Sequence, residues 1–368
     1  MKQIISITIS LLFLQIGIVK AQEITMSLGG PTHSGVYNTK PIKKFTGVKW
    51  KTELEANGGE NFIIKDNILY VNACRGTYSE RKGYFYAIDA ITGKLNWKDS
   101  IDRFVSSPTM KDSILYYGSD DKDCKIRALN NKNGKLVWEL KLDRNSCWPP
   151  ALYNDKAYFG DHGGNWFVVN NITGFVIYKQ KFDSGICNSS SILDSIIYFS
   201  DESGKLHAIN GNTNIEIWTF NSGSKSLNAP SIVNGVAYLI TESGTLYAIN
   251  IKNGSLLWSY KTDDSMYRGP AVSDGIATLI TTNGHIYAFN IKDGSVLWET
   301  KKAGLGYTNT AIAGNIVYVG CADNHLYAFD LKTGKEIWNF KCDSPVNTPL
   351  IDNCIVYFTC GKYLYALE

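Results

Sequence analysis

The sequence predicts an all-β fold, an eight-bladed β-propeller of four-stranded antiparallel blades. Three observations predict it. A pattern with a period of 40 residues recurs through most of the 368-residue chain, each repeat holds four short strand-like segments, and no window favours a long helix. The length itself favours a repeated architecture, because single hydrophobic cores stop growing at about 250–300 residues.

Composition and charge narrow the classes of function. Hydrophobic residues make up 44% of the chain and charged residues 19%, which excludes an intrinsically disordered protein. The 22 tyrosines and 33 glycines, against only four methionines, favour strands joined by tight turns. A formal net charge of +3 gives no basic surface for nucleic acid or for anionic membranes. We therefore expect neither of these partners.

The first 21 residues are organised like a secretory signal peptide. Lys2 supplies a positive start, residues 4–19 are almost entirely apolar, and Ala21 completes a small-residue cleavage site. A membrane anchor is the alternative, but this apolar stretch is shorter than the about 20 residues that span a bilayer. No cysteine lies near the cleavage site, so we expect no lipid anchor. These features predict an exported protein, periplasmic or secreted as in Gram-negative bacteria.

Cleavage after the signal peptide (1–21) would leave a lead-in over residues 22–44 and one propeller domain over residues 45–368. The fifth repeat shows the four strands expected in a blade. They are residues 228–233, 236–241, 245–250 and 255–261. Asn and Gly separate these apolar runs, as in β-hairpins.

An aromatic residue marks the outer strand of seven repeats. The first spacing between these residues is 41 and the other five are 40, at Trp97, Trp138, Tyr178, Trp218, Trp258, Trp298 and Trp338. We expect each indole to cover the gap to the neighbouring blade, a burial worth about 5 kcal/mol gross. These residues are therefore predicted to be structural.

The turn before each outer strand has its own chemistry. Asp or Asn opens it, as at Asp89, and Gly closes it, as at Gly93, where a left-handed backbone is needed. Asn214 is the one exception to the closing glycine, and Asn is the next-best residue for that conformation. We interpret these turns as structural and not as phosphate-binding loops.

The number of blades follows from counting strands at the two ends of the repeat region. Strands of the Tyr-Ala-Ile type occur eight times and end at Leu367, but outer strands follow only seven of them. The missing outer strand is predicted at residues 48–52, around Trp50. Docked beside residues 364–367, it would close the ring as eight blades and remove exposed sheet edges.

The repeat xLYAxDxxTGKxxW resembles the pyrroloquinoline-quinone-like (PQQ-like) propeller repeat over about residues 45–368. Residues 30–37, GPTHSGVY, resemble the lead-in of exported members of that family. The family includes quinoprotein dehydrogenases and the outer-membrane assembly lipoprotein BamB. WD40 repeats share the period, but here Trp follows a glycine turn and forms no Trp-Asp pair, so that family is rejected.

The two kinds of family member imply different functions. Quinoprotein dehydrogenases are much longer and carry adjacent cysteines over the quinone and a Glu/Asn/Asp set around calcium. This chain has no adjacent cysteines and mostly minimal loops, so we expect no cofactor, with PQQ and calcium disfavoured. The resemblance to BamB fits the size and blade number better, although the lipidated cysteine is absent.

Export would permit disulfides among the eight cysteines, none of which forms a CxxC motif. Cysteines at equivalent positions of adjacent blades, or in adjacent second turns, suggest three pairs: Cys74–Cys124, Cys147–Cys187 and Cys321–Cys360. The alternative is that these residues are free, buried thiols.

One face of the propeller is expected to carry the entry to every innermost strand. It would form a channel mouth lined by Trp148, Asn188, Asn228, Tyr267, Arg268, Tyr307 and Asn309. In the functional interpretation the aromatic residues stack on a planar ligand and Arg268 holds a carboxylate. The alternative is a water-filled funnel with a polar lining. The longest irregular loop, residues 72–83, holds Arg75 and Arg81 and is the first candidate for a partner contact.

The remaining polar clusters are weaker candidates. His162, His207, His285 and the acidic residues 120–123 are interpreted as turn or packing residues, and no metal site is predicted. The sequence thus predicts an exported, non-catalytic, monomeric scaffold that binds a protein or a cell-envelope component. The alternatives are a PQQ-dependent oxidoreductase and a propeller that binds or cleaves glycans.

Overall fold

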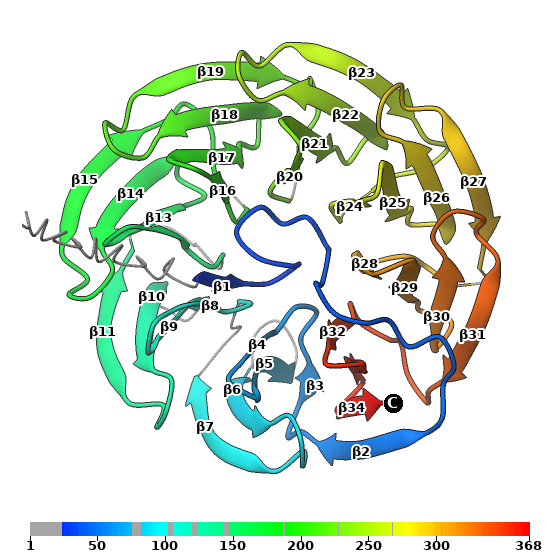
Figure 1. Ribbon diagram of the computed structural model, residues 1–368. Coiled ribbons are helices and arrows are strands. Elements are labelled where there is room, and N and C mark those ends of the chain that lie inside the picture. The colour runs from blue at the N-terminus through cyan, green and yellow to red at the C-terminus, as the bar shows by residue number, and fades with distance from the viewer. Residues whose placement is uncertain are drawn as a thin grey trace, which may run out of the picture.

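The computed structural model describes residues 24–75, 82–101, 106–119, 124–142, 148–186, 188–226, 228–266, 268–302 and 304–368. Over these residues the chain forms 34 strands and no helix. The strands make eight antiparallel sheets arranged around a central axis (Figure 1). The predicted eight-bladed propeller is therefore confirmed. The predicted signal peptide lies outside the described residues and stays an expectation.

Blades 1 and 2 each have one strand beyond the basic four. Blade 1 comprises β4 (Ile63–Lys65), β5 (Ile68–Arg75), β6 (Lys82–Asp89) and β7 (Leu95–Ile101), with β3 (Asn57–Gly58) also paired to β5. Blade 2 comprises β8 (Thr109–Lys111), β9 (Ile114–Ser119), β10 (Lys125–Asn130) and β11 (Leu136–Lys141), with β1 (Ile24–Met26) paired to β8.

Blades 3 to 7 are regular four-stranded sheets whose strands follow one another from the axis outward. Blade 3 comprises β12 (Ala151–Tyr153), β13 (Lys156–Gly160), β14 (Asn165–Asn170) and β15 (Val176–Lys181). Blade 4 comprises β16 (Ser191–Leu193), β17 (Ile196–Ser200), β18 (Lys205–Asn210) and β19 (Glu216–Asn221). Blade 5 comprises β20 (Ser231–Val233), β21 (Val236–Ile240), β22 (Thr245–Asn250) and β23 (Leu256–Lys261). Blade 6 comprises β24 (Ala271–Ser273), β25 (Ile276–Ile280), β26 (His285–Asn290) and β27 (Val296–Lys301). Blade 7 comprises β28 (Thr310–Ala313), β29 (Ile316–Gly320), β30 (His325–Asp330) and β31 (Glu336–Lys341).

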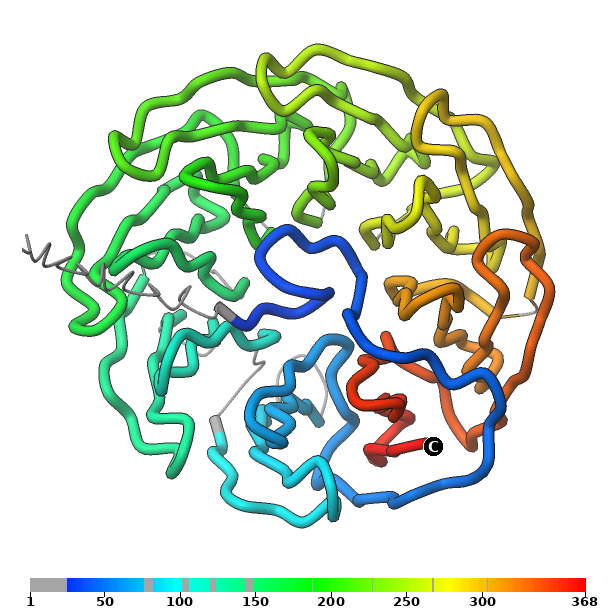
Figure 2. The backbone as a smooth tube through the Cα atoms, viewed as in Figure 1, coloured from blue at the N-terminus to red at the C-terminus, as the bar shows by residue number. Residues whose placement is uncertain are grey.

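Blade 8 closes the ring with strands from both ends of the propeller. It comprises β32 (Leu350–Asp352), β33 (Ile355–Cys360), β34 (Tyr363–Leu367) and, outermost, β2 (Val48–Glu53). In the pairing of β2 with β34, Trp50 lies opposite Ala366 and Thr52 opposite Leu364. Figure 2 shows the blue and red parts of the chain side by side in this blade. The predicted closure by the strand around Trp50 is confirmed.

The tryptophans of the outer strands fasten each blade to the next one. The indole Nε1 of Trp258 donates to Ile291 O at 2.8 Å, and that of Trp50 donates to Ala90 O at 3.0 Å. Equivalent bonds are made by Trp97, Trp138, Trp218, Trp298 and Trp338. In blade 8 no turn joins the third strand to the outer strand, because β34 and β2 come from opposite ends of the propeller. Trp338 therefore donates to the carbonyl of Ile42 in the lead-in instead.

The glycine that closes each of these turns is required for two reasons. Gly254 has φ of 72°, and a Cβ at this position would lie 2.7 Å from the Trp218 ring of the preceding blade. Asn214, with φ of 59°, is the exception. It follows the one blade whose outer strand carries Tyr178 in place of Trp. The glycine therefore admits both the left-handed turn and the neighbouring indole.

The lead-in runs through the centre of the ring, where the sequence analysis placed no structure (Figure 1). Strand β1 pairs with β8, and successive lead-in carbonyls then accept hydrogen bonds from the innermost strands of four blades. The acceptors are Pro31, Thr32, Ser34 and Gly35, and the donors are the amides of Ile192, Ile232, Val272 and Ile312. These bonds satisfy main-chain groups that the innermost strands would otherwise present to the axis.

Candidate functional site

A funnel lies at the axis, on the face from which the chain enters each innermost strand. Its cavity encloses about 540 Å³. Ser27, Leu28 and His33 of the lead-in line it, and its walls come from the entry segments of the blades. A second cavity of about 310 Å³ is lined by the lead-in and by residues of β4 and β32. The lead-in therefore divides the axial space and forms the floor of the funnel.

The structure brings only part of the predicted set to the cavity. Trp148, Asn228 and Arg268 line the funnel. Tyr307 lies beside Arg268, which donates from Nε to the Tyr307 carbonyl at 2.9 Å, and the tyrosine is 44% exposed. Tyr267 and Arg81 lie outside the described residues. Arg75 ends β5, with its guanidinium 5.6 Å from the centre of the Tyr84 ring.

Asn188 and Asn309 are buried in the wall and do not line the cavity. The Asn188 amide donates to Ser200 O at 3.1 Å, to Ser200 Oγ at 2.6 Å and to Ser226 O at 3.3 Å. The Asn309 side chain donates to Asn61 Oδ1 at 3.4 Å. Both amides join adjacent segments of the wall, so their geometry fits a structural role better than ligand contact.

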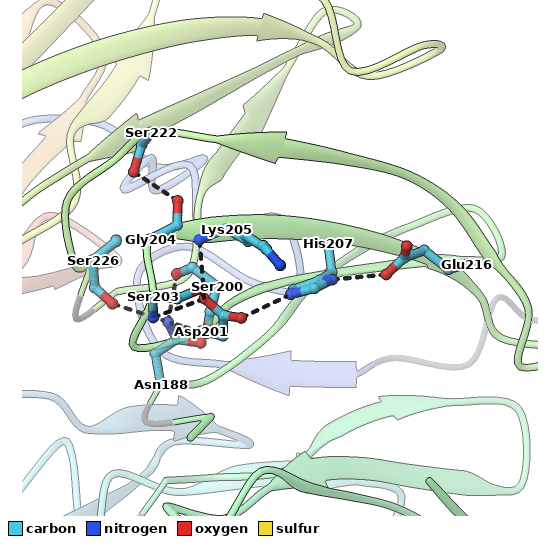
Figure 3. Close-up of polar contacts among 10 residues, drawn as sticks. All are labelled: Asn188, Ser200, Asp201, Ser203, Gly204, Lys205, His207, Glu216, Ser222 and Ser226. Atoms are coloured by element: carbon cyan, nitrogen blue, oxygen red, sulfur yellow. Dashed lines mark hydrogen bonds and ion pairs between the residues drawn. The ribbon is translucent and has the colours of Figure 1, made fainter. Parts of the chain in front are cut away.

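A charged network supports this wall in blade 4 (Figure 3). His207 lies between two carboxylates, with Nε2 3.3 Å from Asp201 Oδ2 and Nδ1 2.8 Å from Glu216 Oε2. Its ring also stacks on Phe199, with the ring centroids 4.9 Å apart. Burial by itself would raise the pKa of Asp201. The hydrogen bonds from His207, Ser203 and the Lys205 amide outweigh that effect and lower this pKa to about 2.

A segment of blade 1 that the sequence analysis did not single out crosses the mouth of the funnel. Residues 57–61 line the cavity, and Glu60 forms an ion pair with Arg268 of the entry to blade 6. Asn347 Nδ2 donates to Gly58 O at 3.0 Å, and Thr359 Oγ1 donates to Gly59 O at 2.9 Å. The signal was available, because Glu60 follows Trp50 by ten residues, just as Arg268 follows Trp258, and so occupies the same entry position of its repeat.

This ion pair changes the interpretation of Arg268. The sequence analysis assigned its guanidinium to a ligand carboxylate, but a carboxylate of the same chain is already there. The Arg268 side chain is 19% exposed and that of Glu60 is 40% exposed. Arg268 therefore ties blade 1 to blade 6 across the rim, which makes the mouth of the funnel more rigid.

Two buried polar atoms point to unused hydrogen-bonding capacity at the funnel. His33 Nε2 and Trp148 Nε1 have no hydrogen-bond partner within the described part of the chain, and both residues line the cavity. Burial lowers the pKa of His33 to about 4, against the raising effect of a hydrogen bond to the Ser190 backbone. The His33 imidazole is therefore neutral at pH 7. It can offer one polar atom to a molecule in the funnel.

The predicted disulfides that can be checked are not formed. Cys321 and Cys360 are free thiols, and the Cys74–Cys124 bridge is absent as well. Cys321 Sγ faces Leu305 O at 3.9 Å, whereas Cys360 Sγ faces Ser344 O at 3.3 Å. Each sulfur faces a carbonyl 16 residues before it, so the two equivalent cysteines point the same way around the ring and not toward each other. Equivalence in the repeat was therefore the wrong criterion for pairing. The Cys147–Cys187 pair lies outside the described residues.

The funnel does not fit a quinone held by calcium. Glu60 is the one carboxylate among the described lining residues, and it is paired with Arg268. No group of three or more His, Cys, Asp and Glu side chains in the described ranges could hold a metal ion. Calcium prefers six to eight oxygen ligands, several of them from carboxylates. We therefore derive no catalytic step through a quinone or a metal.

Comparison with known families gives one match that spans the propeller. The PQQ-like family model described as "Outer membrane protein assembly factor BamB" matches residues 46–192, 177–310 and 283–367. In addition, 152 residues are 28% identical to the quinoprotein alcohol dehydrogenase PedH of Pseudomonas putida. That match covers 36% of this chain and 24% of the dehydrogenase. The chain thus spans about a quarter of the curated relative that it matches.

Solved structures share the fold at low sequence identity. BamB from Moraxella catarrhalis superposes with a TM-score of 0.71 and 18% identity, over 88% of this chain and 97% of that one. The quinohemoprotein alcohol dehydrogenase of Comamonas testosteroni gives 0.74 and 13% identity, over 93% of this chain and 80% of the other. No helix within the described residues is long and apolar enough to cross a membrane.

Proposed function

Because the chain belongs to the PQQ-like family described as outer membrane protein assembly factor BamB, we propose that it is an exported, non-catalytic β-propeller. In this proposal it binds a protein or another cell-envelope component with the face that carries the funnel. The family match spans the whole propeller, whereas the match to a dehydrogenase covers about a third of the chain. The predicted signal peptide supports export.

One observation carries the proposal: the chemistry of the funnel is suited to binding and not to catalysis. Its lining is rich in serine, asparagine and glycine, with one indole, and its single described carboxylate is already paired. General acid–base catalysis needs a positioned group that can gain or lose a proton at the working pH. Hydroxyls, amides and main-chain groups of this kind instead supply hydrogen bonds to a bound molecule.

The rim adds exposed apolar surface to this polar cavity. Leu305 is 48% exposed and Tyr307 is 44% exposed, both on the segment that enters blade 7. The Arg268 hydrogen bond to the Tyr307 carbonyl holds this segment beside the Glu60–Arg268 pair. An aromatic residue on a rigid support is a common anchor in protein interfaces. This combination supports a macromolecular partner at the rim.

Site-directed photo-crosslinking in the cell envelope tests the proposal. A photoreactive phenylalanine analogue replaces Tyr307 at the rim, and in a matched control it replaces Phe175, which is 72% exposed beside a turn of the opposite face. We expect one defined crosslinked product from position 307 that Trp148→Ala weakens, and no such product from position 175. Identical products from both positions, or none from position 307, would contradict a partner at the funnel face.

The dehydrogenase match makes a quinone-dependent oxidoreductase the second candidate. Purified protein incubated with PQQ and calcium should then acquire quinone absorbance and reduce an artificial electron acceptor when an alcohol is added. We expect neither signal, because the lining lacks the carboxylates that calcium requires. Calcium-dependent dye reduction that is lost on gel filtration in a chelator would replace the scaffold proposal with the enzymatic one.

A further inference from the structure

Two cysteines meet in the interface between blade 7 and blade 8. Cys342 follows β31 and Cys360 ends β33, and they are 5% and 1% exposed. They belong to one buried cluster with Val346 and Phe358. Val346 forms an isolated antiparallel bridge with Cys360, and Cys360 Sγ lies 3.3 Å from the carbonyl of Ser344. Both are free thiols, and each shifts the pKa of the other, as side chains in one cluster do when they lie side by side.

The repeat places these two positions in the same interface wherever two blades meet. Phe182 is the counterpart of Cys342 in blade 3, and its ring lies 5.4 Å from that of Phe199, two residues before the counterpart of Cys360. The equivalent pairs at the other seven interfaces are Leu54/Ala73, Ile101/Ser119, Leu142/Asp161, Phe182/Asp201, Ser222/Thr241, Thr262/Thr281 and Lys302/Cys321. Only the interface between blades 7 and 8 has cysteine at both positions.

We propose that Cys342 and Cys360 form a disulfide that joins blade 7 to blade 8 when the chain folds under oxidising conditions. The oxidant is a small or protein disulfide. The thiolate of one of the two cysteines attacks one of its sulfur atoms and expels a thiolate, which takes up a proton. The other cysteine then attacks the protein sulfur of the mixed disulfide, loses its own proton and expels the second thiolate. One disulfide is formed, one is reduced to two thiols, and two electrons are transferred.

The closed interface keeps the two thiols close to each other and away from solvent. Contact with Cys342 lowers the pKa of Cys360, whereas the same contact and burial raise that of Cys342. Because both side chains are buried, an external oxidant reaches them only before the interface closes. The bond therefore forms during folding, and the folded, reduced protein is protected from oxidation.

Peptide mapping tests the pairing directly. The full chain with Cys354→Ser is refolded in a glutathione redox buffer, unreacted thiols are alkylated, and the protein is cleaved before aspartate. Cys342 then lies in fragment 330–342, Cys360 in fragment 352–368 and Cys321 in fragment 293–322. We expect the first two fragments to be linked and to separate on reduction. A free fragment 352–368, or one linked to fragment 293–322, would overturn the proposal.

Thermal unfolding tests whether the Cys342–Cys360 disulfide stabilises the folded protein. Closing this loop of 19 residues should raise the midpoint of the oxidised protein by about 4 °C over the reduced one. Cys342→Ala and Cys360→Ala should each remove that response to reductant, while Cys354→Ser, at an exposed thiol, should keep it. A response of equal size in all four proteins would assign the effect to other cysteines and contradict the proposal.

Discussion

Blades 3 to 7 share one kind of interface, and the junction around blade 8, where the two ends of the propeller meet, adds further contacts to it. The shared device is an indole that packs under a glycine and donates to a main-chain carbonyl of the next blade, with Tyr178 and Asn214 as the exception between blades 3 and 4. The junction adds contacts that occur once, among them the pairing of β2 with β34, the Ile42 carbonyl under Trp338 and the segment around Glu60. The funnel draws on both regions, because His33 and Glu60 come from unrepeated segments whereas Trp148 and Arg268 come from repeated entry segments.

This difference has a physical reason. A repeated interface must be satisfied by local sequence, because every blade meets its neighbour with the same geometry. The junction joins residues that are about 300 positions apart, so its sequence can depart from the repeat without disturbing the other blades. The same freedom allows the lead-in to enter the axis. We expect perturbations of the two regions to differ in size and in pH dependence.

The largest effect should come from removing an interface indole. Trp218→Ala in the regular part and Trp50→Ala at the junction should each lower the free energy of unfolding by about 3–5 kcal/mol. Each substitution removes the packing of an indole and its hydrogen bond, which measures 2.9 Å at Trp218 and 3.0 Å at Trp50. Urea unfolding followed by fluorescence measures the change, with Trp218→Phe as a control that keeps most of the packing. A loss below about 1 kcal/mol at position 50 would show that the junction does not depend on its indole.

As the pH is lowered, the packing of the lead-in should lose stability at a higher pH than the packing of the blades. Burial lowers the pKa of His33 from 6.5 to about 4, so the unfolded chain binds the proton more readily between these values. The stabilisation from neutral His33 is fully present above pH 6.5 and is lost as the pH falls toward 4. The free energy of unfolding should fall by about 3 kcal/mol over this range. Urea midpoints measured from pH 7.5 to 4 should show this slope, and His33→Gln should flatten it. An unchanged slope in the variant would contradict the burial of a neutral imidazole.

A bulkier residue at Gly35 should detach the lead-in from the axis. A Cβ there would lie 2.5 Å from Ala271 Cβ, and φ is 70°. We expect Gly35→Ala to cost about 2–3 kcal/mol and to expose residues 24–42 to proteolysis while the blades persist. Gly47→Ala is the matched control, since a Cβ at that position meets nothing within 4 Å. Equal protection of the lead-in in both variants would contradict its close packing at the axis.

A smaller acid effect is expected from the regular part of the ring. The pKa of Asp201 is lowered from 3.8 to about 2, so its contribution is present above pH 3.8 and is lost as the pH falls toward 2. The loss should be about 2 kcal/mol. Asp201→Asn should remove the part of the stability that changes with pH in this window. If the variant kept the full change below pH 4, other carboxylates would be responsible.

The smallest effect is expected from the ion pair across the funnel. Both side chains are partly exposed, so Glu60→Gln and Arg268→Met should show a coupling energy of about 0.5–1 kcal/mol in a double-mutant cycle. The coupling should fall as salt is added. Lys362→Met with Glu53→Gln, an ion pair more exposed on both sides, serves as the control. A coupling no larger than in that control would show that the pair does not hold the rim.

Much of the fold could be predicted because its determinants are local and repeated. Trp218, Gly254 and Asn210 recur at a fixed period, and each specifies a strand, a turn or an interface within one or two repeats. The outer strand around Trp50 could be predicted because one strand was missing from the count. The candidate site was harder. Trp148, Asn228 and Arg268 reach the funnel as predicted, but nothing local distinguishes them from Asn188, which is buried in the wall.

Local sequence patterns specify the blade, the number of blades and the closure of the ring, since these depend on periodic residues with short-range chemistry. The packing of the whole chain was needed to establish what fills the axis, which carboxylate meets Arg268 and which cysteine faces Cys360. These contacts join residues 208 positions apart, as in Glu60–Arg268, or positions on different blades whose directions the period does not encode. Their partners are set by how eight sheets close around one axis, which is a property of the whole ring and not of any repeat.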